Sequence, residues 1–208
     1  MSSDSTKSAP LDSVPACPLA AGIRVHVVAR KCRDALLAFV DPSAADWDKG
    51  QLATWLAGHA AITNLAPEVE RAERQTSDVV PSLLCVQLES ENGDEVARNA
   101  REAVLARLER AVSDGDISFA REAIALGTVR PCRDSWGYDG WMPVDGARVP
   151  LVQRVLSLAA VDYLVRPADY LALLAKCDRC DAITFDAAAR YRGTCDVHAP
   201  KLRSVPWD

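Results

Sequence analysis

The sequence has no excess of basic residues, since 24 Lys and Arg stand against 29 Asp and Glu and the formal net charge is −5. Proteins that hold nucleic acid through broad electrostatic attraction need a strongly basic face. The composition therefore disfavours that class of protein, although a local basic patch is compatible with it.

The sequence also lacks a long apolar run. The stretch from Val149 to Val165 is interrupted by Gln153, Arg154 and Asp162, whereas a membrane span needs about 20 consecutive apolar residues. The N-terminal segment is rich in Ser, Asp and Pro and has neither the basic nor the apolar region of a secretory signal. We therefore expect a cytoplasmic protein in which residues 1–20 form a disordered tail.

The common catalytic motifs are missing as well. The sequence contains no Gly-x-Ser-x-Gly, no phosphate-binding loop, no Gly-x-Gly-x-x-Gly and no His-Glu-x-x-His. Acids such as Asp139 and Asp145 lie in predicted turns, where Asp commonly forms local hydrogen bonds. An enzyme whose site assembles around residues 134–146, from Asp139, Asp145 and His26, is therefore the weakest of our three functional hypotheses.

The composition that is present, 49% hydrophobic and 25% charged, is typical of a globular protein with a sizeable core. Apolar residues at helical spacing, together with Pro, Asp and Gly at the ends, predict helices over 31–40, 47–64, 67–75, 94–113, 117–126, 150–165 and 167–176. Alternating apolar residues over Gly22–Ala29 predict a strand, and the Val- and Leu-rich run Val79–Glu89 predicts its partner. The fold class predicted for residues 21–175 is α+β, predominantly helical, with a small β-sheet.

The seven cysteines fall into two groups. Four of them, Cys17, Cys32, Cys85 and Cys132, are scattered and are expected to be small buried hydrophobes. The other three belong to the pattern Cys-x2-Cys-x14-Cys-x2-His at the C-terminus, formed by Cys177, Cys180, Cys195 and His198.

That pattern predicts a closed metal site. Two residues between ligands allow a tight turn to direct both side chains at one ion, and the longer gap spans a structure that brings the second pair back. Four protein ligands leave no coordination position for substrate, so a structural ion is favoured over a catalytic one. We expect one structural zinc ion per chain, while the spacing alone leaves a rubredoxin-type iron site open.

The segment 176–200 resembles the zinc-ribbon and treble-clef class of small zinc modules, and we treat residues 176–208 as a separate module. Pro200 and the nearby terminus leave little room for the helix that a treble clef starts at its second pair of ligands, so the ribbon form is favoured. Within it, Ala182–Phe185 is expected to form a strand with Phe185 shielding the metal. Tyr191–Thr194 is expected to form the return strand and turn.

A second candidate site is the loop around Trp136, which combines aromatic residues, acids and glycines. Trp and Tyr are enriched at interaction hot spots, and loops commonly carry function. The alternative is a loop that its own aromatic residues attach to the core. The candidate interaction residues are Trp136, Tyr138, Asp139, Trp141 and Asp145.

These features favour a non-enzymatic intracellular regulatory or adaptor protein that binds another protein through the ribbon and the Trp136 loop. Fold type alone does not choose among the partners of zinc modules. The second hypothesis is a transcription-related nucleic-acid-binding protein that uses the ribbon and its basic residues Arg190, Arg192, Lys201 and Arg203. The near-neutral charge of the module weakens that hypothesis.

Overall fold

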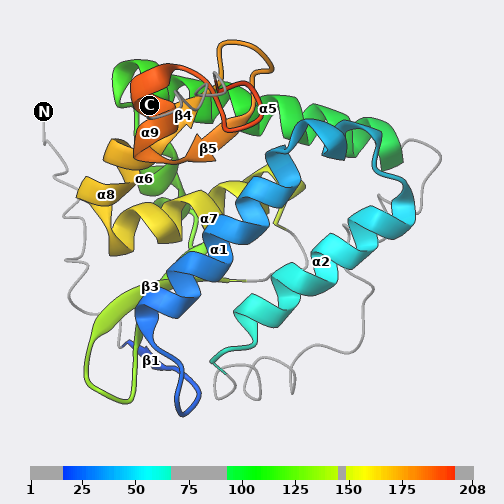
Figure 1. Ribbon diagram of the computed structural model, residues 1–208. Coiled ribbons are helices and arrows are strands. Elements are labelled where there is room, and N and C mark those ends of the chain that lie inside the picture. The colour runs from blue at the N-terminus through cyan, green and yellow to red at the C-terminus, as the bar shows by residue number, and fades with distance from the viewer. Residues whose placement is uncertain (1–15, 67–92, 145–148, 200–208) are drawn as a thin grey trace, which may run out of the picture.

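A computed structural model describes residues 16–66, 93–144 and 149–199 of the chain. In these ranges the chain is mostly helical and carries two small sheets (Figure 1). The helices are α1 (Val25–Val40), the 3-10 helix η2 (Pro42–Asp46), α2 (Lys49–Thr63), α5 (Gly93–Asp114), α6 (Ser118–Ala125), α7 (Leu151–Val165), α8 (Pro167–Leu173) and α9 (Ala187–Arg192). The strands are β1 (Cys17–Pro18), β2 (Val129–Arg133), β3 (Asp139–Pro143), β4 (Leu174–Lys176) and β5 (Ile183–Phe185). The predicted α+β, predominantly helical fold class is confirmed.

Helix α7 is the centre of the core. Ten of its 15 residues are buried, including every residue from Arg154 to Asp162. A helix with apolar residues on all sides is surrounded by other elements, and α1, α5 and α6 all pack on α7. None of the described helices combines the length and the apolar character that crossing a membrane requires.

The strand predicted over Gly22–Ala29 is wrong, because this segment contains the first turn of α1. The alternation of Ile23, Val25 and Val27 covers only a few residues. Ile23 and Val27 are four positions apart, so they also fit a helical period. The buried residues continue at helical spacing through Val28, Cys32, Leu36 and Phe39, so burial along the whole segment determines the helix. The expected partner strand Val79–Glu89 and the helix expected over 67–75 lie outside the described residues.

The small sheet of the helical body is built from other segments. Strands β2 and β3 form an antiparallel hairpin on either side of the loop expected around Trp136. Strand β1 pairs in parallel with β2, where Cys17 and Pro18 lie opposite Cys132 and Arg133. Gly140 allows the hairpin to approach α1, since a Cβ atom there would lie 2.7 Å from the Val25 Cβ. The remaining predicted helices correspond to α2, α5, α6, α7 and α8 within a few residues at each end.

Candidate functional site

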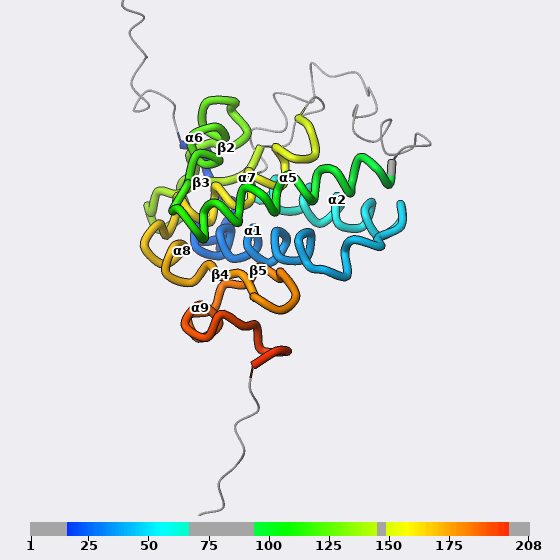
Figure 2. The backbone as a smooth tube through the Cα atoms, turned by 90° about the horizontal axis from the view of Figure 1, so that it is seen from above, coloured from blue at the N-terminus to red at the C-terminus, as the bar shows by residue number. Residues whose placement is uncertain are grey.

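The C-terminal segment 174–199 forms a Cys/His module, which continues directly from α8. Strands β4 and β5 are antiparallel, with Leu174 opposite Phe185 and Lys176 opposite Ile183. The turn between them carries Cys177 and Cys180. Helix α9 and a second turn then bring back Cys195 and His198. Figure 2 shows the module on one side of the helical body, next to α1.

Backbone hydrogen bonds fix the first pair of ligands. The Cys177 N–H donates to the Ala182 carbonyl, and the Asp181 N–H donates to the Cys177 carbonyl, both at 2.9 Å. Asp181 has a φ of 59°, in the left-handed region that Asp and Asn enter more easily than most residues. The Arg179 N–H donates to the Cys177 Sγ at 3.5 Å. The turn therefore sets the direction of the Cys177 sulfur before any ion binds.

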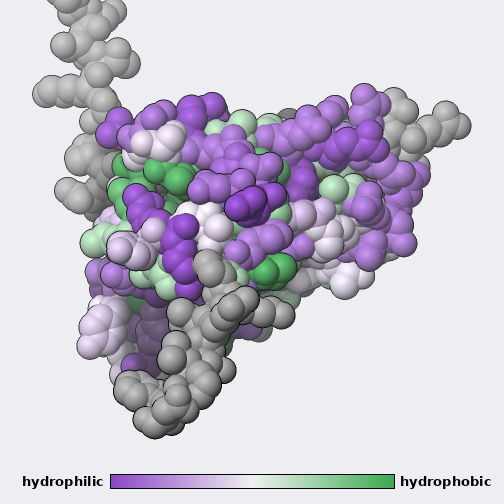
Figure 3. Space-filling view, turned by 45° about the horizontal axis from the view of Figure 1, so that its top comes forward, coloured by the Kyte–Doolittle hydropathy of each residue, from purple (hydrophilic) through white to green (hydrophobic). Residues whose placement is uncertain are grey.

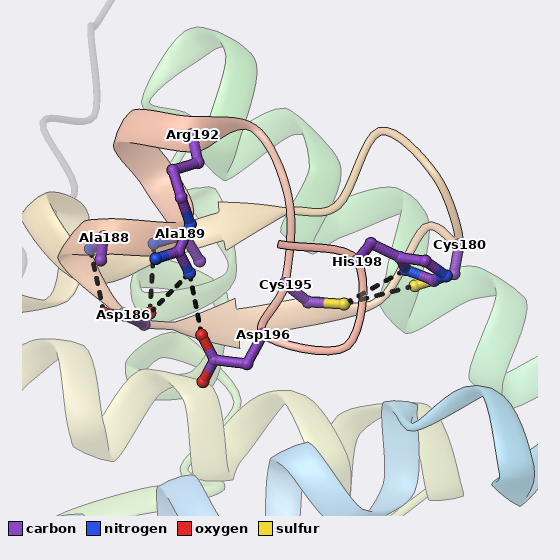
Figure 4. Close-up of polar contacts among 8 residues, drawn as sticks. All are labelled: Cys180, Asp186, Ala188, Ala189, Arg192, Cys195, Asp196 and His198. Carbon is purple, nitrogen blue, oxygen red and sulfur yellow. Dashed lines mark hydrogen bonds and ion pairs between the residues drawn. The ribbon is translucent and has the colours of Figure 1, made fainter. Parts of the chain in front are cut away.

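Helix α9 positions the second pair of ligands. Asp186 caps the helix by accepting hydrogen bonds from the N–H groups of Ala188 and Ala189 (Figure 4). Gly193 ends the helix with a φ of +69°, and its carbonyl accepts a hydrogen bond from the Asp178 N–H. A Cβ atom at residue 193 would lie 2.5 Å from the Asp178 Oδ2. The end of α9 is thus in contact with the first turn, which requires glycine at this position.

The four ligand atoms lie close enough together to hold one metal ion. They all lie within 4.8 Å of one another. The Cys180 and Cys195 sulfurs are 3.8 Å apart, and the His198 Nδ1 lies 3.4 Å from the Cys195 sulfur (Figure 4). The same Nδ1 lies 3.6 Å from the Cys177 sulfur. A tetrahedral ion with bonds of about 2.3 Å to sulfur and about 2.0 Å to nitrogen requires edges of roughly 3.8 and 3.5 Å. The cluster can therefore hold a metal ion through three sulfurs and the Nδ1 nitrogen.

The electrostatics of the site favour the ligand form of Cys177. The N–H group of Cys195, followed by those of Arg179 and Cys180, lowers the pKa of the Cys177 thiol to about 6. Metals bind the thiolate and not the thiol.

The site is closed on one side and open on the other, because Cys177 and Cys195 are buried while His198 is exposed.

The module is attached to the helical body by an aromatic contact and an ion pair. The centre of the Phe185 ring lies 4.9 Å from that of the Tyr170 ring of α8. The Arg33 guanidinium of α1 lies 4.6 Å from the centre of the Phe185 ring. Lys176 Nζ pairs with Glu109 of α5 at 2.7 Å. Phe185, which was expected to shield the metal, therefore contacts the helical body.

The return strand expected over Tyr191–Thr194 is wrong, because this segment is the end of α9 and its terminating turn. The predicted strand over Ala182–Phe185 is confirmed as β5. Asp186 provides the cap that starts a helix after β5, and the three alanines and the arginine that follow favour a helix. The module thus has one strand, β5, and one helix, α9, between its two pairs of ligands, and the first pair lies in the turn of the β4–β5 hairpin.

A buried ion cluster next to the module was not predicted. Asp162 of α7 is fully buried and accepts two hydrogen bonds from Arg33, at 2.7 and 3.1 Å, and one from Arg166 at 2.8 Å. In the sequence, Asp162 only interrupts an apolar run. Its partners were not evident, because Arg33 is distant in sequence and Arg166 lies at the end of the helix. Since Arg33 also contacts Phe185, this cluster connects the centre of the core to the module.

The Trp136 loop is the rigid tip of the β2–β3 hairpin. Trp136 and Tyr138 are 50% and 64% exposed. The buried Asp134 carboxylate accepts hydrogen bonds from the N–H groups of both residues at 3.0 Å, and the Arg24 guanidinium lies 4.4 Å from the centre of the Trp136 ring. We call Trp136 and Tyr138 with Asp134 the hairpin tip.

The other predicted loop residues do not form one site with the tip. Trp141 is half-buried and packs against the core. Asp139 is exposed and pairs with Arg133 at 2.7 Å, and Asp145 lies outside the described residues. Among the described residues, no hydrogen bond or ion pair joins Asp139 to His26.

Most described basic residues of the module are paired within it. The Arg190 guanidinium donates to the Leu174 carbonyl. Arg192 pairs with Asp196 at 2.8 Å and with Asp186 at 3.8 Å. Lys201 and Arg203 lie outside the described residues.

Comparisons with protein-family models, with curated proteins and with solved structures find no match to this chain.

Proposed function

We propose that Cys177, Cys180, Cys195 and His198 bind one structural zinc ion. Three thiolates and one imidazole are donors that zinc favours, and the spacing of the ligand atoms suits its tetrahedral preference. All four positions are filled by protein, so no substrate reaches the ion. The ion stabilises the fold of the module. Free thiols outside disulfides are typical of a reducing, intracellular compartment, and we place the protein there.

We further infer that the chain is a non-enzymatic regulatory or adaptor protein that acts by binding another protein. The observation that carries this proposal is the hairpin tip, where Trp136 and Tyr138 are exposed on a turn that the buried Asp134 carboxylate fixes. Exposed Trp and Tyr on a rigid support lose little conformational entropy on binding and are enriched at hot spots. On the face in Figure 3, hydrophobic areas are small and surrounded by hydrophilic ones, which suits a regulated contact better than a permanent one.

The nucleic-acid hypothesis has less support. Arg190, Arg192 and Lys176 of the module each engage a partner in the same chain, so few of its cations are available to phosphates. The enzyme hypothesis also has less support, because Asp139 is exposed and pairs with Arg133.

The proposal is tested by purifying the tagged full chain from its native host. We expect a stoichiometric protein partner, and we expect Trp136→Ala with Tyr138→Ala to remove it. Tyr191→Ala is the matched control, because Tyr191 is an exposed aromatic residue on the module, at 94% exposure. A partner that survives the double change at the tip would contradict the proposal, as would a chain that elutes from its host with nucleic acid alone.

A further inference from the structure

The exposed side of α1 carries cations next to the hairpin tip. Arg30 and Lys31 are exposed and make no ion pair with any described residue. Arg24, at the start of the helix, is exposed and lies over the Trp136 ring. This local positive charge contrasts with the net charge of −5 of the whole chain.

These residues follow one another along the start of α1. Arg24 is the N-cap of α1 and has an extended backbone, and Lys31 lies seven positions later, about 10 Å further along the helix axis. Val27 is three positions before Arg30 and four before Lys31, so these three residues are neighbours on the helix surface. Val27 is half-exposed. We call the surface formed by the hairpin tip, Arg24, Val27, Arg30 and Lys31 the tip–α1 strip. Asp34, also exposed, limits the positive region one turn beyond Lys31.

The strip combines two kinds of contact. Trp136 and Tyr138 offer apolar area at one end, and the cations follow along the helix. A fixed aromatic pair provides affinity, whereas exposed cations provide orientation and a faster encounter with an oppositely charged partner. Trp, Tyr and Arg are also the residue types that hot spots contain most often.

We propose that the tip–α1 strip binds a short acidic segment of a partner protein, an inference that rests on the proposed function. An extended segment advances about 3.3 Å per residue, so two carboxylates about three residues apart match the separation of Arg24 and Lys31. An apolar side chain just before them packs on Trp136 and Tyr138. Three cations are few for nucleic acid, where proteins commonly neutralise about 6 to 10 phosphates.

The test is fluorescence anisotropy of the metal-loaded full chain with a short labelled peptide of alternating acidic residues and leucine. The control peptide has Asn and Gln in place of the acids. We expect saturable binding of the acidic peptide alone, weakened by added salt. Arg30→Glu with Lys31→Glu raises its Kd by about tenfold or more, since two attractive contacts become repulsive.

A matched charge reversal separates local from overall charge effects. Arg98→Glu with Arg121→Glu makes the same change in net charge at two other exposed arginines, and we expect it to change the Kd less than about twofold. Trp136→Ala raises the Kd more than about tenfold. Circular dichroism of each variant verifies that its helices are intact.

Several results would overturn the inference. These are no saturable binding, equal binding of the amide peptide, or equal weakening by both charge reversals. Preferential binding of a single-stranded oligonucleotide or of anionic vesicles, sensitive to Arg30 and Lys31, would assign the strip to another class of ligand. If the host partner requires Trp136 and Tyr138 but tolerates the reversal at Arg30 and Lys31, only the acidic-segment inference fails and the proposed function stands.

Discussion

The helical body and the Cys/His module depend on different interactions. In the body, Val155, Leu158 and Ala159 of α7 are fully buried, and burial of apolar area stabilises the fold by about 25 cal/mol per Å². Apart from cysteines, the buried residues described in the module are Leu174, Ala175, Ile183 and Ala189, and Leu174 and Ile183 pack into the core of the body. The module therefore has little apolar burial of its own, and we expect caps, turns and a bound metal ion to stabilise it.

The cysteines show the same contrast. Cys32 and Cys132 are fully buried in the body, and burial raises the pKa of the Cys132 thiol to about 12. At Cys177 the N–H group of Cys195 and its neighbours lower the pKa to about 6. The same residue type thus fills space in one region and is prepared as a metal ligand in the other.

The largest expected effect is in the body, at Asp162. Asp162→Ala leaves Arg33 and Arg166 without their buried carboxylate, and removing one member of such a cluster costs about 3–5 kcal/mol. Urea denaturation followed by circular dichroism measures the loss. A change below about 1 kcal/mol would show that the cluster does not stabilise the body.

In the module, Gly193→Ala should weaken metal binding. It forces a left-handed conformation on alanine and brings the Cβ to 2.5 Å from the Asp178 carboxylate, at a cost of about 1–3 kcal/mol and thus about 5- to 150-fold in metal affinity. Gly22→Ala is the control, since Gly22 has a φ of +83° with nothing within 4 Å of an added Cβ. Competition with a chromogenic chelator gives both affinities, and an equal loss in the two variants would refute the role of the contact with Asp178.

Removing a helix cap should have a smaller effect, confined to the region that contains the helix. Asp186→Ala removes the cap of α9 and should cost about 1 kcal/mol, seen as weaker metal binding. Asp48→Ala removes the capping box of α2, with a similar cost that appears in urea denaturation of the body. If Asp48→Ala weakened metal binding as much as Asp186→Ala does, the two regions would not be energetically distinct.

The smallest expected effect is at the hairpin, where Asp139→Asn removes an exposed ion pair. Both side chains of the Arg133–Asp139 pair are more than half exposed, and such pairs contribute less than about 1 kcal/mol. Urea denaturation should detect little change in the free energy of unfolding. A loss comparable to that of Asp162→Ala would mean that the pair has a role the geometry does not explain.

Patterns that come from local physics were predictable from the sequence. The helices α2, α5, α6 and α7 follow from apolar spacing and from breakers such as Gly127, whose φ of +67° ends α6. The cluster of Cys177, Cys180, Cys195 and His198 follows from two short spacings that permit tight turns.

Features that depend on tertiary contacts were not predictable. The segment Gly22–Ala29 is short enough to fit either period, and only its continuation to Phe39 under α7 and α2 determines a helix. The ion cluster at Asp162 forms because the fold brings Arg33 next to it, although the two residues are 129 positions apart in sequence. The cap at Asp186 could have been found from sequence, since Asp followed by Ala-Ala-Ala is a helix start.

The most direct test of the account is the metal content of the purified chain and of its Cys180→Ser variant, measured together with circular dichroism. We predict one zinc ion per chain in the parent and a large loss of bound zinc in the variant. The variant should keep most of its helical signal, because α1, α5 and α6 pack mainly on α7. One metal ion per chain retained in the variant, or iron in the parent, would contradict the four-ligand zinc site.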